Sequence, residues 1–190
     1  MIKLENVNKS YGNQQVLNGF SLDIKDGERV AIMGRSGAGK TTLINLVLGL
    51  IKSDSGAVKV SKDATFGMVF QEDRLIESLS AVGNVSVVLK NPPSEDDVIG
   101  LLENAGLERE LIYKPANELS GGERRRVCIA RALATNADIY IFDEPFKGID
   151  EGTLEKVTEA VAKLTEGKTF ILITHSKDEA NKLCERIIEI

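Results

Sequence analysis

Hydrophobic and polar residues alternate over much of the first third of the chain, which is the pattern of strands with one buried face. The pattern is clearest at residues 2–7, 16–24 and 28–33, and the polar turn IKDGE separates the second stretch from the third. Two shorter stretches, 57–60 and 64–71, read the same way. These stretches predict an N-terminal β part with antiparallel pairing.

Helical periodicity begins at residues 40–50, where apolar residues recur on one side. The residues on that side are Leu43, Leu46, Val47 and Leu50. Strand patterns then vanish between residues 72 and 119. There, NPPS at 91–94 marks a break, and the following segment predicts a helix with Ser94 as its N-cap and Gly106 at its end. We interpret 72–119 as a mainly helical lobe inserted into an α/β body.

The second half of the chain alternates between the two periods. Helices are predicted at 121–135, 151–167 and 176–187, with strands at 138–144 and 168–175 and a final short strand. IYIF and FILI are continuous apolar runs, as strands buried on both faces should be. Strands that alternate with helices predict a mostly parallel central sheet flanked by helices. We therefore expect one α/β domain over 1–190, with a body of 1–71 and 120–190.

A glycine-rich stretch, GRSGAGKT at 34–41, joins the strand at 28–33 to the helix that follows. Its spacing fits the phosphate-binding loop GxxxxGK[ST], in which glycines let backbone N–H groups point inward at a phosphate chain beside a helix N-terminus. Lys40 is expected to reach the β and γ phosphates, and the Thr41 hydroxyl to hold Mg²⁺. The plain alternative is a glycine-rich strand-to-helix turn. The expected nucleotide-binding residues of this loop are Gly34, Arg35, Ser36, Gly37, Ala38, Gly39, Lys40, Thr41 and Thr42.

Two carboxylates follow the apolar strand IYIF, in the stretch IYIFDEP at 139–145. Ligands of parallel sheets bind at the carboxyl ends of the strands, where the phosphate loop also lies. Asp143 is therefore expected to hold Mg²⁺, and Glu144 to polarise a water for attack on the γ phosphate. A strand that ends in a solvated acidic turn is the alternative.

A third motif, LSGGE at 119–123, combines a capping box with two glycines. Ser120 and Glu123 have the spacing of a helix start. Capping does not explain Gly121 and Gly122, which are poor residues for a first turn. A helix tip with a bare backbone favours an anion. Because the phosphate loop already cradles a phosphate within this chain, we expect this tip to serve a nucleotide held elsewhere.

Composition limits the class of protein. With 42% hydrophobic and 28% charged residues, the 190-residue chain is typical of a globular protein with one sizeable core. A net charge of −5 argues against a nucleic-acid partner, and we interpret the basic run RRR at 124–126 as a solvated helix face. Cys128 and Cys184 lack metal-ligand spacing; Cys128 is expected to be a small buried hydrophobe, which fits a reducing compartment. No apolar run approaches a membrane span, so a membrane role requires a partner.

The motifs together carry a family resemblance. GRSGAGKT, Gln71, LSGGE, IFDEP and THS at 174–176 occur in an order that resembles the nucleotide-binding subunits of ABC (ATP-binding cassette) transporters. The resemblance spans nearly the whole chain, and LSGGE discriminates most because other phosphate-loop NTPases lack it. It implies a P-loop NTPase fold, ATP hydrolysis with Mg²⁺, and a head-to-tail dimer of two copies. In that dimer each LSGGE helix covers the ATP that the other copy holds.

The resemblance also implies roles for single residues. Tyr11 resembles the aromatic residue that stacks on adenine, and an exposed loop tyrosine is the alternative. Gln71 resembles the glutamine that contacts Mg²⁺ and the attacking water, with a surface glutamine as the alternative. His175, the only histidine, resembles the switch histidine that bonds the γ phosphate and orients the general base. Asp150 matches the aspartate of a loop that crosses the dimer interface. The catalytic set is thus Glu144, His175, Gln71 and Lys40.

The chain departs from the family pattern at three places. Glu123 stands where the family more often has Gln, and FKGID at 146–150 stands where SALD is common. VFQEDRL at 69–75 resembles importers of nitrate, sulfonate and taurine type, but the ESLS that follows lacks a Pro-Trp pair. The chain ends shortly after its last predicted strand, so we expect no regulatory domain.

The leading hypothesis is an ATPase that drives a transporter, most simply an importer. Its partners would be a second copy of itself, transmembrane permease subunits and, indirectly, a substrate-binding protein. Its location would be cytoplasmic, on the inner face of the cell membrane through the permease. The alternatives are a soluble ABC-type ATPase, a small-molecule kinase that uses the same phosphate loop, and a binding module with negligible hydrolysis.

Overall fold

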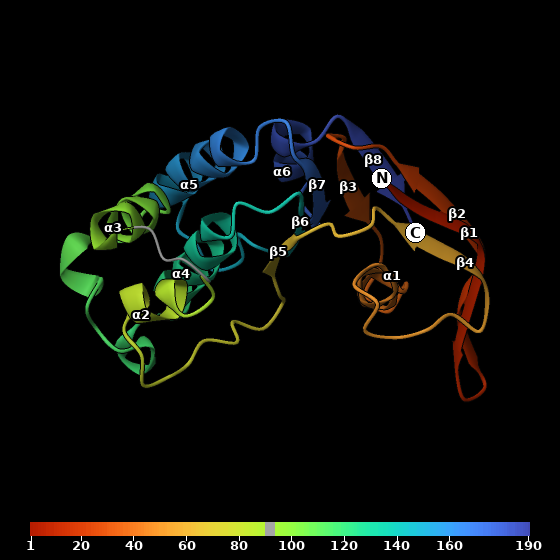
Figure 1. Cartoon of the computed structure of the whole chain (residues 1–190), viewed down its shortest axis with the longest axis horizontal. Coiled ribbons are helices and arrows are strands. Elements are labelled where there is room, and N and C mark those ends of the chain that lie inside the picture. The colour runs from red at the N-terminus through yellow and green to blue at the C-terminus, as the bar shows by residue number, and fades with distance from the viewer. Residues whose placement is uncertain (90–93) are drawn as a thin grey trace.

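The computed structural model of the chain describes residues 1–89 and 94–190 and contains two β-sheets with helices around them (Figure 1). The larger sheet has the order β5-β6-β7-β3-β8, and every neighbouring pair is parallel. Its strands are β3 (Arg29–Met33), β5 (Phe66–Val69), β6 (Ile139–Asp143), β7 (Thr169–Ile173) and β8 (Arg186–Glu189). The predicted parallel sheet is confirmed.

The smaller sheet is antiparallel and has the order β2-β1-β4. Its strands are β1 (Ile2–Tyr11), β2 (Gln14–Ile24) and β4 (Ser55–Val60). The predicted antiparallel β part is therefore present. The strand predicted at 64–71, however, joins the parallel sheet at its edge as β5, and the strand predicted at 28–33 joins it as β3, between β7 and β8. Its run of apolar residues, RVAIM, suits that central and buried position.

Helices cover both faces of the parallel sheet. The α-helices are α1 (Lys40–Val47), α2 (Ala81–Ser86), α3 (Glu95–Asn104), α4 (Gly121–Ala134), α5 (Glu151–Leu164) and α6 (Lys177–Leu183), with short 3₁₀ turns at Arg109–Leu111 and Ala116–Glu118. In Figure 1, α1 lies between the two sheets, whereas α4, α5 and α6 lie on the other side of the parallel strands. Among the described residues, no helix is long and apolar enough to cross a membrane.

Alternate residues of the central strands point into two separate cores. Ile139 and Ile141 of β6 pack with Leu43 of α1 and with the antiparallel sheet. Tyr140 and Phe142, between and after them, face the helices on the opposite side. The side chains on both faces of β6 are buried, which explains why its sequence is continuously apolar.

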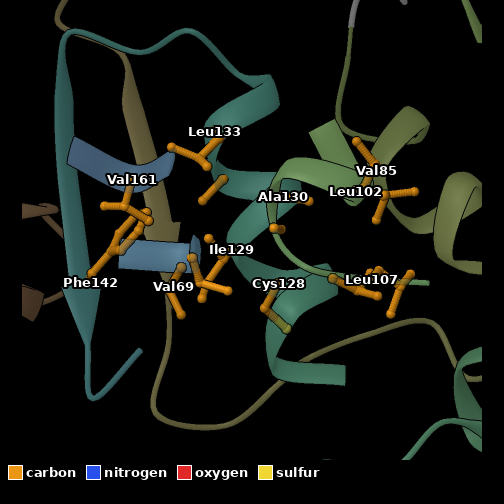
Figure 2. Close-up of a cluster of buried hydrophobic side chains, with 14 of the residues drawn as sticks. Val69, Val85, Leu102, Leu107, Cys128, Ile129, Ala130, Leu133, Phe142 and Val161 are labelled. Atoms are coloured by element: carbon orange, nitrogen blue, oxygen red, sulfur yellow. The ribbon is translucent and has the colours of Figure 1, made fainter. Parts of the chain in front are cut away.

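The second core extends beyond the sheet through α4 (Figure 2). There, Ile129 and Leu133 point toward β6 and α5, Ala130 faces α2 and α3, and the Cys128 thiol donates to the backbone carbonyl of Asp73. Cys128 is the small buried hydrophobe that was expected, and burial raises the pKa of its thiol to about 12. One side of α4 thus belongs to the sheet and the other to the segment 72–119. The division into a body and a lobe at residues 72 and 119 stays a prediction.

The structure differs from the sequence predictions at Leu50 and at Arg124–Arg126. Leu50 does not lie on a buried helix face: α1 ends at Val47, Gly49 turns the chain with φ +69°, and Leu50 is 63% exposed. Arg124–Arg126 is not a solvated face, because Arg125 and Arg126 are buried. The break at Asn91–Ser94 lies mostly outside the described residues, whereas Ser94 is the N-cap of α3 as predicted, in a capping box with Asp97.

Candidate functional site

A cleft of about 270 Å³ opens at the carboxyl ends of the parallel strands. It lies where β3, β6 and β7 end and α1 begins, which is the edge at which such sheets bind ligands. Its lining residues are Tyr11, Val16, Ser36, Gly37, Gly39, Lys40, Thr41, Thr42, Gln71, Asp143, Glu144 and His175. Residues predicted from five separate motifs therefore meet in one place. Gly34, Arg35 and Ala38 line an adjoining cleft on the other side of the same loop, together with His175.

The phosphate loop requires its glycines for two different reasons. Gly37 and Gly39 have φ angles of +81° and +101°, a region that side chains disfavour. At Gly39 a Cβ would also lie 2.9 Å from Val16 Cγ1, and at Gly34 it would lie 2.5 Å from a backbone oxygen. Gly39 is the N-cap of α1 and offers no side chain to the first turn. The N–H groups at that helix start are therefore available to an anion.

Lys40 is held beneath the loop that it follows. Its ammonium donates to the backbone carbonyls of Gly34 at 2.7 Å and Arg35 at 3.0 Å. The ammonium group is thereby kept at the cleft rather than in solvent. Thr41 and Thr42 come next in the first turn of α1 and line the same cleft.

Asp143 ends β6 and is only 7% exposed. Burial raises the pKa of Asp143, and the neighbouring charge of Glu144 adds to that effect. Lys40, Arg125 and His175 oppose the shift, without cancelling it. The site thus holds a carboxylate that lacks sufficient positive charge nearby.

Glu144 has an unusual backbone for a residue with a side chain. Its φ is +46°, and its N–H donates to Ile173 O in β7 at 2.9 Å. A left-handed conformation at a non-glycine residue costs free energy and is often found at functional sites. Here it turns the carboxylate toward His175, whose Nε2 lies 3.3 Å from Glu144 Oε1. The ammonium of Lys147, in the unusual FKGID loop, lies 3.7 Å from Glu144 Oε2.

The backbone around His175 is held by two residues that the sequence reading missed. The Thr174 hydroxyl donates to the Glu179 carboxylate, and Ser176 N–H donates to the Thr174 hydroxyl at 3.0 Å. Burial raises the pKa of Glu179, and Glu144 contributes to the rise. The spacing of Ser176 and Glu179 at the start of α6 was the available signal, because it is the spacing of a capped helix.

Tyr11 and Gln71 come from different sheets and line the same cleft. Tyr11 ends β1, and its ring is 49% exposed with the Lys9 ammonium 5.6 Å from the ring centroid. Gln71 lies two residues beyond the end of β5, so it is not at the last strand position as predicted. Its side chain is nevertheless part of the cleft.

The LSGGE segment does not line this cleft. Ser120 and Glu123 form the predicted capping box at the start of α4. The two glycines differ: a Cβ on Gly122 would lie 2.6 Å from Gly148 O, whereas a Cβ on Gly121 would meet nothing within 4 Å. Gly122 is thus required by packing within the chain. Nothing within the described part of the chain requires a bare backbone at Gly121.

Comparisons with known proteins agree with this arrangement of motifs. The ABC transporter family pattern matches residues 17–147. The chain is 42% identical over 190 residues to the taurine import ATP-binding protein TauB of Jannaschia sp. (strain CCS1), covering 93% of this chain and 70% of that protein. It is 34% identical to the lipoprotein-releasing system ATP-binding protein LolD of Bacteroides thetaiotaomicron, covering 100% of this chain and 96% of that protein. A solved dimeric structure of the ATP-binding cassette MJ0796, in a post-hydrolysis state bound to ADP and Pi, has a TM-score of 0.90 and 36% identity, covering 100% of this chain and 94% of that one.

A phosphate loop, a buried acid after a parallel strand and a parallel sheet between helices define a phosphate-loop NTPase, and the LSGGE segment at the start of α4 is the feature that other members of that class lack. The chain belongs to the ABC transporter family, as one of its ATP-binding, ATP-hydrolysing subunits. A small-molecule kinase is thereby excluded.

Proposed function

We propose that this subunit hydrolyses ATP in the cleft and drives an importer through a permease at the inner face of the cell membrane. The observation that carries the proposal is the meeting of Tyr11, the phosphate loop, Gln71, Asp143–Glu144 and His175 around one cleft. Each of these elements has a separate part in binding or cleaving ATP. Import is supported by the names of similar proteins, which include importers of taurine and of aliphatic sulfonates.

The nucleotide would lie with its phosphates in the loop and its base toward Tyr11. The exposed Tyr11 ring offers a flat surface for stacking on adenine. Lys40 supplies positive charge for the β and γ phosphates, and the uncapped start of α1 supplies N–H donors. The backbone of Gly34–Gly39 approaches the phosphates because side chains are absent where they would obstruct it.

Mg²⁺ fits the residues present. Within residues 1–89 and 94–190, no group of three or more His, Cys, Asp or Glu side chains is suited to hold a metal alone. Mg²⁺ typically uses one or two protein carboxylates together with phosphates and waters. Asp143, Thr41 and Gln71 would hold it, and its charge would offset both the phosphates and the buried Asp143 carboxylate.

Glu144 acts on the attacking water. The water oxygen forms a bond to the γ phosphorus while the bond from that phosphorus to the bridging oxygen breaks, and ADP leaves. Glu144 takes the proton of the water, and His175 holds the Glu144 carboxylate in position through the 3.3 Å contact. The hydrogen bond from Glu144 N–H to Ile173 O maintains the left-handed backbone of Glu144. The carboxylate therefore does not have to be reoriented before each turnover.

The site is completed by a second copy of the chain. Gly121 is exposed at the start of α4 and faces open space, so a phosphate of another copy can approach the backbone there. Ser120 would accompany it, while Gly122 and Glu123 shape the turn. A head-to-tail pair would satisfy both tips at once, as symmetric dimers do. Asp150, paired with Arg126 at 3.5 Å, lies on the loop that would cross this interface.

Hydrolysis is tested by Glu144→Gln, which removes the charge but keeps the shape. We expect turnover to fall by about 10²–10⁴-fold, as for a lost general base, while ATP still binds. Glu155→Gln on the exposed face of α5 is the matched control and should leave turnover unchanged. Near-normal turnover in Glu144→Gln would refute the assignment.

Transport is tested separately from hydrolysis. A tagged chain should co-purify with a membrane-spanning protein, and ATP turnover should rise when that protein is present in vesicles. The cargo is then found by assaying uptake through the permease, with taurine and alkyl sulfonates as the first substrates. In vesicles that enclose the ATPase, ATP-driven loss of cargo from the lumen would contradict import.

A further inference from the structure

Arg125 of α4 lies behind Gln71 instead of in solvent. Arg125 is only 6% exposed, and its two terminal nitrogens donate to the backbone carbonyls of Phe70 and Gln71, each at 2.6 Å. These two residues directly follow β5, where pairing with β6 has ended. The guanidinium therefore replaces the hydrogen bonds that the sheet no longer provides.

Arg125 is itself held by a carboxylate. Asp73 Oδ1 lies 3.4 Å from Arg125 Nη1, and Asp73 Oδ2 lies 3.5 Å from Arg124 Nε. A planar guanidinium can bond two adjacent carbonyls and a carboxylate at fixed angles, which a lysine ammonium cannot do. The arrangement is thus specific for arginine at position 125.

Residues 73–77 are also hydrogen-bonded to α4. Arg131 donates to the carbonyls of Asp73 at 3.1 Å and Arg74 at 2.8 Å, and Arg124 bonds the Glu77 carboxylate. The chain between β5 and α2 is therefore fastened to α4 over residues 70–77 (Figure 1). Only the Arg125 bonds act on Gln71, because the others lie further along.

We propose that Arg125 is a positioning residue for ATP hydrolysis: it fixes the Gln71 backbone so that the Gln71 side chain stays in the ATP cleft. Because Arg125 and LSGGE belong to the same helix, the Arg125 hydrogen bonds also join the Gln71 backbone to the helix whose tip faces the second copy. One helix thereby links the nucleotide that the chain holds to the nucleotide that it covers. This inference rests on the role of Gln71 in the proposed function.

The test compares Arg125→Lys with Arg131→Lys, because both replace an arginine of α4 that bonds backbone carbonyls. We expect Arg125→Lys to lower kcat by about 10–100-fold, since small misplacements of a reacting group have effects of this size. ATP affinity, measured by calorimetry, should stay within about threefold, since binding is made by other residues. Arg131→Lys should lower the melting temperature about as much as Arg125→Lys does. It should nevertheless leave kcat within about threefold of the parent. Equal loss of kcat in both variants would overturn the proposal.

A double-mutant cycle shows whether Arg125 acts through Gln71. In a Gln71→Ala background, Arg125→Lys should reduce kcat little further, whereas independent residues would give multiplicative losses. Multiplicative losses would overturn the positioning role while leaving the role of Gln71 intact. If Gln71→Ala alone leaves kcat unchanged, the role proposed for Gln71 fails instead. Should Arg125→Lys not fold, Asp73→Asn loosens the same guanidinium and should show the same dependence on Gln71.

Discussion

The helices α1 and α4 both have glycine at or next to their first residue, and their first turns are arranged in opposite ways. At α1, Gly39 is the N-cap and no side chain bonds the first turn, so the N–H groups face the cleft. At α4, Ser120 and Glu123 form a capping box, and the exposed Gly121 faces open space. Both tips favour an anion, but only the first has the rest of a site around it.

Glycines near a helix start can thus be required for different physical reasons. Gly39 has a left-handed backbone and a close neighbour in Val16, and Gly122 lies against Gly148. Gly121 has neither feature. The phosphate loop therefore has the other cleft residues of the same chain around it. The LSGGE tip does not line that cleft. A second copy of the chain is the partner that the proposed function assigns to it.

The largest effect of a single substitution is expected at the first tip. Lys40→Ala removes the ammonium that offsets the phosphate charge, and we expect ATP affinity to fall by about 30-fold or more, as for a lost partner of a hydrogen-bonded charge pair. Calorimetry measures the affinity directly. Lys52→Ala, an exposed lysine shortly after α1, is the control and should bind ATP normally. Unchanged affinity in Lys40→Ala would mean that the loop does not hold phosphates.

At the second tip, Gly122→Ala should damage the chain itself. The added Cβ would lie 2.6 Å from Gly148 O, which belongs to the backbone and cannot rotate away. Overpacking of this kind costs about 1–3 kcal/mol of unfolding free energy. Urea denaturation measures the change. A variant as stable as the parent would show that the close approach of the two glycines is not needed.

Asp143→Asn should exchange activity for stability. The pKa of Asp143 is raised above its ordinary 3.8, so the folded state binds its proton more tightly than the unfolded state does. Stability from this group is therefore present at low pH and is lost as pH rises from 3.8 through the folded pKa. At neutral pH the uncharged Asn variant should be more stable by about 0.5–2 kcal/mol, with little hydrolysis.

The pH dependence of that gain is the sharper measurement. The difference between variant and parent should shrink as pH falls toward the ordinary carboxyl value, because the parent then carries a protonated Asp143. Thermal melts at several pH values give the curve. A gain that is independent of pH would assign the added stability to another cause.

Gly121→Ala should have the smallest effect on the stability of the chain. Its Cβ would enter open space, so the unfolding free energy should change by less than about 0.5 kcal/mol, as for a surface substitution. The methyl group should nevertheless hinder a phosphate from approaching the backbone, so ATP-dependent association should weaken. A large loss of stability would contradict the distinction between Gly121 and Gly122.

Much of this arrangement could be predicted because its signals are local. The apolar run of β6, the glycine spacing of the phosphate loop and the capping box of α4 are each contained within a few residues. Their meeting in one cleft also follows, since parallel strands bring their carboxyl ends to one edge.

The arginines of α4 show where local reading fails. They lie in a segment with helical periodicity, and charged residues on a helix usually face solvent. Arg125 is buried because residues 70–77, far away in sequence, cover it and offer carbonyls that have no strand partner. Glu179 is similar, because its link to Thr174 depends on how α6 folds back beside β7. Such contacts join segments that are far apart in the sequence, so the local hydrophobic pattern does not predict them.

The central claim is that each ATP is held by one copy of the chain and covered by the Ser120–Gly121 tip of another. Light scattering on Glu144→Gln tests it directly, because slow hydrolysis leaves ATP in place. We predict a monomer without nucleotide, a dimer with saturating ATP, and a monomer again when Ser120→Glu is added, although that double variant still binds ATP. A Glu144→Gln protein that stays monomeric at saturating ATP and high concentration, or a dimer that tolerates Ser120→Glu, would contradict the claim.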